Sequence, residues 1–274
     1  MNNLEQNLLS LPVDEKISFM GKTWSIQFIE KPKYSKGEGK TDLFIQLMSD
    51  THTQTIKLSV KQPTADFMEN KVSAERAEQL FGNNYAKIIK DTALSLYKEF
   101  LETPIYYPEK KGNTRAGSYT MGWRLDIVNK SGGRLSAPIH LSKTMLGEIL
   151  SGTNLPLNKR DCYVQNMLVK DGGIANYYYA GDGENSIQQL LDKSILIEDY
   201  VSQNTLNWYF AFKAVNYRSL EDKIDGNRPL AVRVNWSNKT LCFDQPLQYG
   251  AKDNLKLYQE DLCESVVCFP VRVD

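Results

Sequence analysis

Residues 41–62 read TDLFIQLMSDTHTQTIKLSVKQ, and this stretch decides the fold. It contains two runs rich in β-branched and large apolar residues, 41–49 and 53–62, separated by a few polar residues. Such runs are typical of strands, and so short a polar separation is typical of a hairpin. Pro63 ends the second run because proline cannot donate a backbone hydrogen bond to a sheet. We therefore predict an antiparallel hairpin.

The predicted hairpin brings an acidic and a basic side chain together. If its turn centres between residues 51 and 52, Asp42 faces Lys61 and Phe44 faces Ser59. Directly opposed residues of an antiparallel pair lie on the same face, with β-carbons roughly 5 Å apart. Since alternate residues of a strand point to the same side, Ser59 and Lys61 share this face. We expect the Asp42, Ser59 and Lys61 side chains to project together.

Phosphodiester hydrolysis uses such a group of side chains. A carboxylate holds Mg²⁺, the metal ion neutralises charge building on the phosphate, and a lysine positions the attacking water or helps to deprotonate it. The backbone carbonyl of Val60 is a further candidate ligand. Gln62 is a candidate for contact with substrate or metal-bound water. One carboxylate is rarely enough for such a site, so a second acidic residue is expected nearby.

The order Asp42, strand, turn and Ser59-Val60-Lys61 resembles the active-site hairpin of the PD-(D/E)xK nuclease superfamily, which includes most type II restriction enzymes. Ser59 stands where that motif has its second acid, and Thr41 where it has proline. Restriction enzymes that cut around a CCGG core show the same departure. They take the missing carboxylate from the following helix, fourteen residues after the lysine, and that position is Glu75 in this chain.

The resemblance covers roughly residues 38–80. Those enzymes carry an arginine-rich recognition stretch between the lysine and the glutamate, whereas QPTADFMENKVSA here has no arginine. We therefore expect this chain to share the metal site of those enzymes but not their CCGG specificity. Glu38 and Glu78 remain alternatives to Glu75 as the second acid.

The resemblance implies a Mg²⁺-dependent, sequence-specific endonuclease that cuts double-stranded DNA, with Mn²⁺ able to substitute for Mg²⁺. The implied catalytic residues are Asp42, Ser59, Lys61, Gln62 and Glu75, and the implied metal ligands are Asp42, Glu75 and Val60. Cutting both strands suggests a homodimer, and a type II enzyme has a cognate DNA methyltransferase as a functional partner. The alternatives are a repair or structure-specific nuclease and a non-catalytic DNA-binding protein.

The rest of the chain suggests an α/β fold with a restriction-endonuclease-like core, a central mixed β-sheet flanked by helices, and a β-rich carboxy-terminal half. Helical periodicity is expected near 3–10, over 73–81 after a Ser73 cap, and over 84–102, with shorter helices around 143–151 and 185–194. Strand-like runs follow residue 118 and recur up to 264–273. We expect a catalytic core at 1–105 and a DNA-recognition and dimerisation region at 106–274.

Basic residues beyond residue 105 are the candidates for DNA contact. Lys110, Lys111 and Arg115 lie in a Pro- and Gly-rich segment that suits a phosphate-gripping loop, or simply a solvated linker. Arginines of the later strands are candidates for contact with base edges. They are Arg124, Arg134, Arg218 and Arg233, and Arg115 is a further candidate for such contact.

Composition narrows the function without deciding it. The 274-residue chain has 33 basic and 33 acidic residues, which argues against a protein that coats nucleic acid non-specifically. Only two histidines accompany four cysteines that lack zinc-site spacing, so we expect reduced structural thiols. The amino terminus lacks the basic start and longer apolar run of a signal peptide, which predicts a cytoplasmic protein.

Overall fold

The computed structural model describes residues 3–12, 16–62, 67–203, 207–236 and 239–249. The chain forms two compact units, each built from two separate stretches of sequence. The first unit comprises residues 1–65 and 141–205, and the second comprises residues 66–140 and 206–274. This division differs from the expected boundary at residue 105, because the chain leaves the first unit soon after the predicted hairpin and returns to it later.

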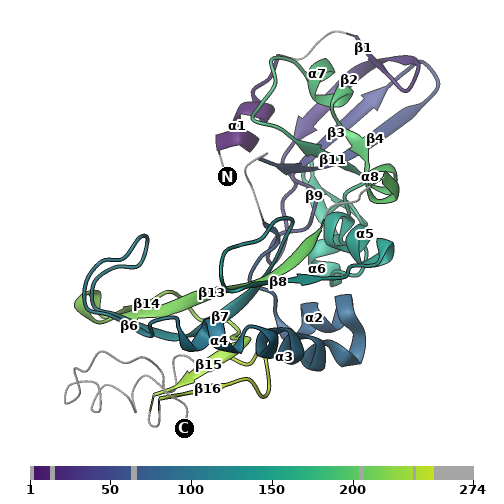
Figure 1. The fold of residues 1–274 in the computed structure, drawn as a ribbon. Helices are drawn as coiled ribbons and strands as arrows, with labels where there is room; N and C mark the ends of the chain where they lie inside the picture. Colours follow the sequence, from purple (N-terminus) through teal and green to yellow (C-terminus); the bar gives the residue numbers. More distant parts are fainter. Residues whose placement is uncertain (1–2, 13–15, 63–66, 204–206, 237–238, 250–274) are drawn as a thin grey trace. The chain divides into compact units, whose positions relative to one another are not determined.

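The first unit is built on a mixed six-stranded sheet (Figure 1). Its strands in spatial order are β1 (Ile17–Phe19), β2 (Lys22–Glu30), β3 (Leu43–Met48), β4 (Thr53–Lys61), β11 (Tyr177–Ala180) and β12 (Ile195–Leu196). β11 runs parallel to β4, and the other neighbours are antiparallel. A parallel pair needs a long crossover connection. Here the connection runs through the second unit and then through helix α5 (Lys143–Ser151).

One face of this sheet carries the main core of the first unit. Apolar side chains alternate along β3 and β4, and the inward-facing ones are fully buried, namely Leu43, Ile45, Leu47, Ile56 and Leu58. Helices α1 (Asn3–Leu9) and α7 (Ile187–Asp192) add buried leucines to the same cluster. The alternation therefore fixes which strand residues face away from this core.

The opposite face of β3 is partly covered by a small hairpin of β9 (Cys162–Val164) and β10 (Met167–Val169). The buried side chains of Cys162 and Val164 pack with Phe44. Helix α6 (Leu157–Arg160) precedes this hairpin, and helix α8 (Ile197–Gln203) packs against α5. Because Phe44 lies two residues from Asp42, the β9–β10 hairpin borders the face from which Asp42 projects.

The second unit contains an eight-stranded antiparallel sheet. Its central strands are β7 (Ser118–Val128) and β13 (Trp208–Arg218). The shorter strands are β5 (Phe67–Glu69), β6 (Tyr106–Tyr107), β8 (Ser136–Ile139), β14 (Lys223–Ile224), β15 (Val232–Asn235) and β16 (Thr240–Cys242). A 3₁₀ turn, η2 (Ser219–Glu221), links β13 to β14.

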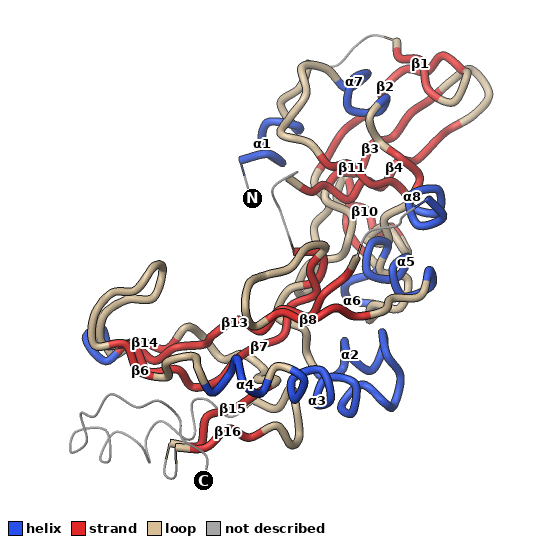
Figure 2. The backbone as a smooth tube through the Cα atoms, viewed as in Figure 1, coloured by secondary structure: helices blue, strands red, loops and turns tan. Residues whose placement is uncertain are grey.

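Helices α2 (Ala74–Phe81), α3 (Tyr85–Ser95) and α4 (Tyr97–Leu101), with the 3₁₀ turn η1 (Gly82–Asn84), belong to this second unit (Figure 2). Phe81 contacts Phe210 edge to face, and Phe100 contacts Trp123 and Phe212 in the same way. The predicted core, a central sheet flanked by helices, places helices 73–81 and 84–102 on the sheet that carries the hairpin. That assignment is wrong, because their apolar faces are buried against β7 and β13.

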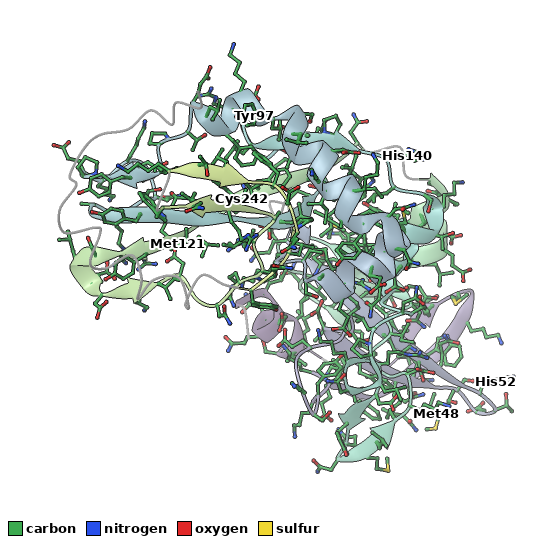
Figure 3. The ribbon with its side chains drawn as sticks, turned by 90° about the horizontal axis from the view of Figure 1, so that it is seen from below. Met48, His52, Tyr97, Met121, His140 and Cys242 are labelled. Atoms are coloured by element: carbon green, nitrogen blue, oxygen red, sulfur yellow. The ribbon has the colours of Figure 1, made fainter. Side chains whose placement is uncertain are left out.

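The predicted hairpin exists, but its register differs by two residues from the expected one. Leu43 pairs with Leu58 and Phe44 with Lys57, so Asp42 lies opposite Ser59 rather than Lys61. The turn is centred between Asp50 and Thr51, one residue earlier than expected, and the Ser49 amide donates to the His52 carbonyl at 2.9 Å. Figure 3 shows His52 at this exposed tip. A shift of two preserves the alternation of side chains, so Asp42, Ser59 and Lys61 still share one face.

Most other expected elements are confirmed. The Ser73 side chain accepts a hydrogen bond from the Arg76 amide and caps α2, and Gly82 ends it. The expected helices around 143–151 and 185–194 are α5 and α7. The strand expected at 264–273 lies outside the described residues. The fold is therefore mixed α/β, and no helix among residues with described positions is long and apolar enough to span a membrane.

Candidate functional site

The side chain of Asp42 is fixed across the hairpin at the beginning of β3. Its backbone amide donates to the Leu58 carbonyl at 2.8 Å. Its carboxylate Oδ2 accepts a hydrogen bond from the Val60 amide at 2.7 Å. Two contacts to the same strand hold the carboxylate near the end of β4, where Lys61 lies.

Ser59 and Lys61 have different surroundings on β4. Ser59 is buried, with 1% of its surface exposed, whereas Lys61 is partly exposed. The Lys61 carbonyl accepts a hydrogen bond from the Gly181 amide at 3.1 Å, just after the parallel strand β11 ends. This contact fixes the end of β4, so the Lys61 ammonium extends from a well-anchored backbone position.

Burial and the charges of neighbouring residues both affect the pKa of Asp42. Burial of the carboxyl group raises the pKa of Asp42 above its ordinary value, although the residue as a whole is partly exposed. The charge of Lys61 and the Val60 amide act in the opposite direction, and the charge of Glu5 adds to the rise. A carboxylate that is costly to ionise beside a second acid favours a bound cation.

Glu5 of α1 is a site residue that the sequence did not indicate. It is 9% exposed and acts electrostatically on Asp42. Leu4 and Leu8 anchor α1 in the core of the first unit and thereby bring Glu5 to the Asp42 end of the sheet. No motif spacing connects residues 5 and 42, because their proximity is created only by folding. The one available signal was an acid beside a buried leucine of an amphipathic helix.

Lys31 neutralises Glu5 in this structure. Its Nζ lies 2.6 Å from the Glu5 carboxylate and 3.7 Å from that of Glu38. Burial lowers the pKa of Lys31, but the hydrogen bond to Glu5 and the charges of Glu5, Glu38 and Asp42 outweigh this effect and raise it overall. The end of the sheet thus holds two acids, Glu5 and Asp42, with two lysines, Lys31 and Lys61.

The helix-borne acids predicted from the resemblance lie elsewhere. Glu75 is an exposed residue in the first turn of α2, and Glu78 is exposed one turn later. Both belong to the second unit, so the first unit by itself contains Asp42 and Lys61 without them. Glu38, the other alternative, is exposed in the loop before β3 and close to Lys31. The role of Glu75 stays a prediction.

The remaining candidates near the hairpin differ in accessibility. Val60 is buried, and its amide is the group that binds Asp42. Gln62 is exposed just beyond β4. Thr41 is 2% exposed, and its hydroxyl has no hydrogen-bond partner among the described residues. A buried hydroxyl next to Asp42 that lacks a protein partner is suited to a bound water.

Most arginines predicted to contact DNA form ion pairs within the second unit. Arg115 pairs with Glu221, Arg134 with Glu102, and Arg218 with Glu221 and Asp225. Arg124 contacts Asp126 at 3.3 Å, and Asp126 is fully buried. Arg115 and Arg134 remain exposed despite their ion pairs, and Lys110 and Lys111 are exposed between β6 and β7. The Nε of Arg233 is buried without a hydrogen-bond partner in the described structure.

Within the described residues, no group of three or more His, Cys, Asp or Glu side chains is arranged to hold a metal ion. A two-carboxylate site remains compatible with Mg²⁺, which usually binds one or two carboxylates and keeps several water ligands. No protein-family model matches this chain, and neither a curated protein nor a solved structure matches it.

Proposed function

We propose that this protein is a Mg²⁺-dependent endonuclease of the restriction-enzyme type that hydrolyses double-stranded DNA. The observation that carries the proposal is the Asp42 carboxylate, whose pKa burial raises overall, held by the Val60 amide and favoured in its charged form by Lys61, with Glu5 as a neighbouring acid. These residues supply an anionic metal site and an adjacent cation in one place. That combination suits phosphodiester hydrolysis.

The first unit supports the proposal through its architecture. A mixed sheet with helices around it carries the hairpin in its middle, as the resemblance to the nuclease superfamily implies. The paired Asp42 and Lys61 strands lie next to a parallel strand, β11. A restriction-endonuclease-like core is therefore proposed for residues 1–65 and 141–205.

The residues have distinct proposed roles. Asp42 and Glu5 would hold Mg²⁺, which supplies charge neutralisation for the phosphate and acidifies bound water. Lys61 orients a water at the scissile phosphate and stabilises negative charge on it. Lys31 holds the Glu5 carboxylate in place through their 2.6 Å ion pair until a divalent cation binds. Gln62, exposed beyond β4, is placed to contact substrate.

The proposal extends to the assembly that cuts a duplex. Two strands of opposite polarity call for two active sites, so we propose a homodimer that cuts a symmetric sequence. As a restriction enzyme, the protein would act beside a DNA methyltransferase that protects the same sequence. Size-exclusion chromatography with light scattering tests the dimer, and resistance of methylated genomic DNA to cutting tests the second point.

A plasmid digest tests the function itself. Millimolar Mg²⁺ or Mn²⁺ should yield fixed fragments from unmethylated plasmid, and EDTA should prevent cutting. Smears, or cutting confined to nicks and flaps, would instead favour a repair nuclease. Because the described residues contain no three-ligand metal group, a non-catalytic DNA-binding protein is the second candidate. Binding of DNA without cutting in either metal would favour it.

A further inference from the structure

The β9–β10 hairpin is a two-stranded ribbon of the first unit with an exposed turn, which Gln165 joins to Glu30 of β2. Met167 pairs with Val164 and Leu168 with Tyr163, which leaves Gln165 and Asn166 at the turn. Both turn residues have positive φ, 51° and 60°, the conformation of a tight hairpin turn. Among the described strands, β10 pairs only with β9, so its outer edge is open.

The ribbon exposes three large apolar side chains, Tyr163 and Leu168 on its outward face and Met167 beside the turn. Met167 is 67% exposed, Leu168 61% and Tyr163 43%. The inward residues Cys162 and Val164 already provide the contact with the sheet. The three exposed side chains therefore do not contribute to the core of this unit. A local group of exposed apolar residues of this kind is typical of a contact surface.

The ribbon is joined to the loop that leads into Asp42. The Lys33 amide and carbonyl exchange hydrogen bonds with Tyr163 at 3.0 and 2.7 Å. Further along the same loop, the amides of Lys40 and Thr41 donate to the Gly173 carbonyl at 2.8 and 3.2 Å. The ribbon, the loop and the proposed metal site thus form one continuous region of the first unit.

This region also carries unpaired positive charge. Lys33, Lys36 and Lys170 are exposed and Lys159 is partly exposed, and none of the four contacts a carboxylate among the described residues. Among the neighbouring acids, Asp171 is paired with Arg160 and Glu38 lies 3.7 Å from Lys31. In the part of the chain that the structure describes, Glu30 and Asp161 accept hydrogen bonds only from neutral donors, so both keep their charge. The four lysines without an ion pair therefore outnumber these two carboxylates, in contrast to the ion-paired arginines of the second unit.

We propose that the β9–β10 ribbon and the 31–40 loop form a docking surface for double-stranded DNA. Lys33, Lys36 and Lys159 contact phosphates, while the ribbon enters the major groove. The major groove admits a two-stranded β-ribbon. There, the Asn166 amide can bind an adenine edge, and Met167 and Leu168 can contact thymine methyl groups. This inference rests on the proposed function, because it places the duplex beside Asp42.

The lysine contribution is tested by DNA binding without cleavage. A fluorescent pool of random duplexes is titrated with the full-length protein in EDTA at several salt concentrations. The variant Lys33→Ala/Lys36→Ala should bind about tenfold more weakly and reduce the salt slope by about 2, one for each lost phosphate contact. The control Lys16→Ala/Lys22→Ala removes two exposed lysines at β1–β2 and should match wild type. Equal affinity and slope for both double variants would overturn the proposal.

The ribbon contribution is tested by the choice of cutting site. Asn166→Gly keeps the positive-φ turn and removes the amide, and it should relax discrimination at one base pair about tenfold when plasmid fragment ends are sequenced. If Asn166→Gly and Met167→Ala/Leu168→Ala both cut DNA with unchanged site choice and affinity, the proposed role of the ribbon is wrong. The nuclease assignment is unaffected by that result. Dissociation of a dimer by these variants with normal DNA affinity would also overturn it, because the surface would then join two copies of the chain. Wild type that neither binds nor cuts DNA would refute the function as well.

Discussion

The carboxylate of Asp42 accepts a hydrogen bond from the backbone amide of Val60, with 2.7 Å between Oδ2 and the amide nitrogen. The contact crosses from β3 to β4 and occupies one carboxylate oxygen. The structure gives Oδ1 no hydrogen-bond partner among the described residues, so this oxygen is available to a cation. The same contact fixes the distance between the Asp42 carboxylate and the residue that precedes Lys61.

Asp42→Asn and Lys61→Ala should each reduce DNA cleavage at least about a thousandfold, since metal-ion and charge stabilisation contribute several kcal/mol to such reactions. Asparagine can still accept the Val60 hydrogen bond, so the fold should be retained. DNA affinity should change little, because phosphate and base contacts elsewhere provide it. Plasmid cutting and binding in EDTA measure the two effects. Near-normal cutting by either variant would show that the active site is assigned wrongly.

The second acid is decided by comparing two glutamates from different units. Glu5→Gln should reduce cleavage about a hundredfold and raise the Mg²⁺ concentration needed for half-maximal rate, because Glu5 acts on Asp42 from within the first unit. Glu75→Gln and Glu78→Gln are the matched controls, and each should stay within a few-fold of wild type. If Glu75→Gln or Glu78→Gln loses activity and Glu5→Gln does not, the second metal-binding acid comes from α2, as the sequence resemblance implies.

Stability should depend on pH through Asp42. Its pKa is raised in the folded protein, so the folded state retains a proton that the unfolded chain releases above the ordinary Asp value of about 3.9. Stability therefore falls as pH rises through this window, and the penalty is complete above the raised pKa. Asp42→Asn should match wild type below about pH 4. Above the raised pKa it should melt at a higher temperature than wild type, because asparagine carries no charge to bury.

Calorimetry between pH 3.5 and 8 in EDTA measures this difference. Millimolar Mg²⁺ should then stabilise wild type and leave Asp42→Asn unchanged, because only the wild-type site binds the cation. A melting difference that is constant across pH would show that ionisation of Asp42 does not limit stability.

Alanine substitutions at two glycines should have opposite effects on stability. A β-carbon on Gly122 would lie 2.4 Å from the Val232 carbonyl oxygen, at a φ of +152°. Gly122→Ala should therefore destabilise the second unit by about 2–3 kcal/mol. Gly147 in α5 has nothing within 4 Å of an added β-carbon, so Gly147→Ala should stabilise the first unit by about 0.5–1 kcal/mol. Urea unfolding measures both, and destabilisation by Gly147→Ala would contradict the packing around α5.

The hairpin and its active face could be predicted from sequence because side chains alternate with a period of two. The register could not, since the length of the tip depends on how residues 49–52 close the turn. A shift of two happens to return Asp42, Ser59 and Lys61 to one face. Helical periodicity located α2 correctly. It predicted one helix over 84–102, which the structure divides at Leu96 into α3 and α4, and it could not indicate which sheet these helices cover.

Some residues at the candidate site could not be predicted from sequence because long-range contacts bring them there. Glu5 reaches Asp42 only because Leu4 and Leu8 seat α1 in the core. In the same way, the sequence cannot show whether an arginine is free to contact DNA or forms an ion pair with a distant acid. Arg115 and Glu221 are more than one hundred residues apart, and no local pattern connects them.

Substitution of Arg124 tests whether this residue has a structural role or a role in DNA recognition. Its guanidinium contacts Asp126 at 3.3 Å, and the carboxylate is fully buried and also accepts from the Lys71 amide at 2.7 Å. Arg124→Ala leaves that charge without its cation and should cost about 2–3 kcal/mol, somewhat less than a fully buried pair because Arg124 is partly exposed. Asp126→Asn in the Arg124→Ala background should recover part of the loss, since the amide still accepts the Lys71 hydrogen bond without a buried charge. DNA affinity in EDTA should be unchanged at a temperature where both variants are folded. Loss of DNA binding with wild-type stability would instead make Arg124 a DNA contact, as the sequence alone predicts.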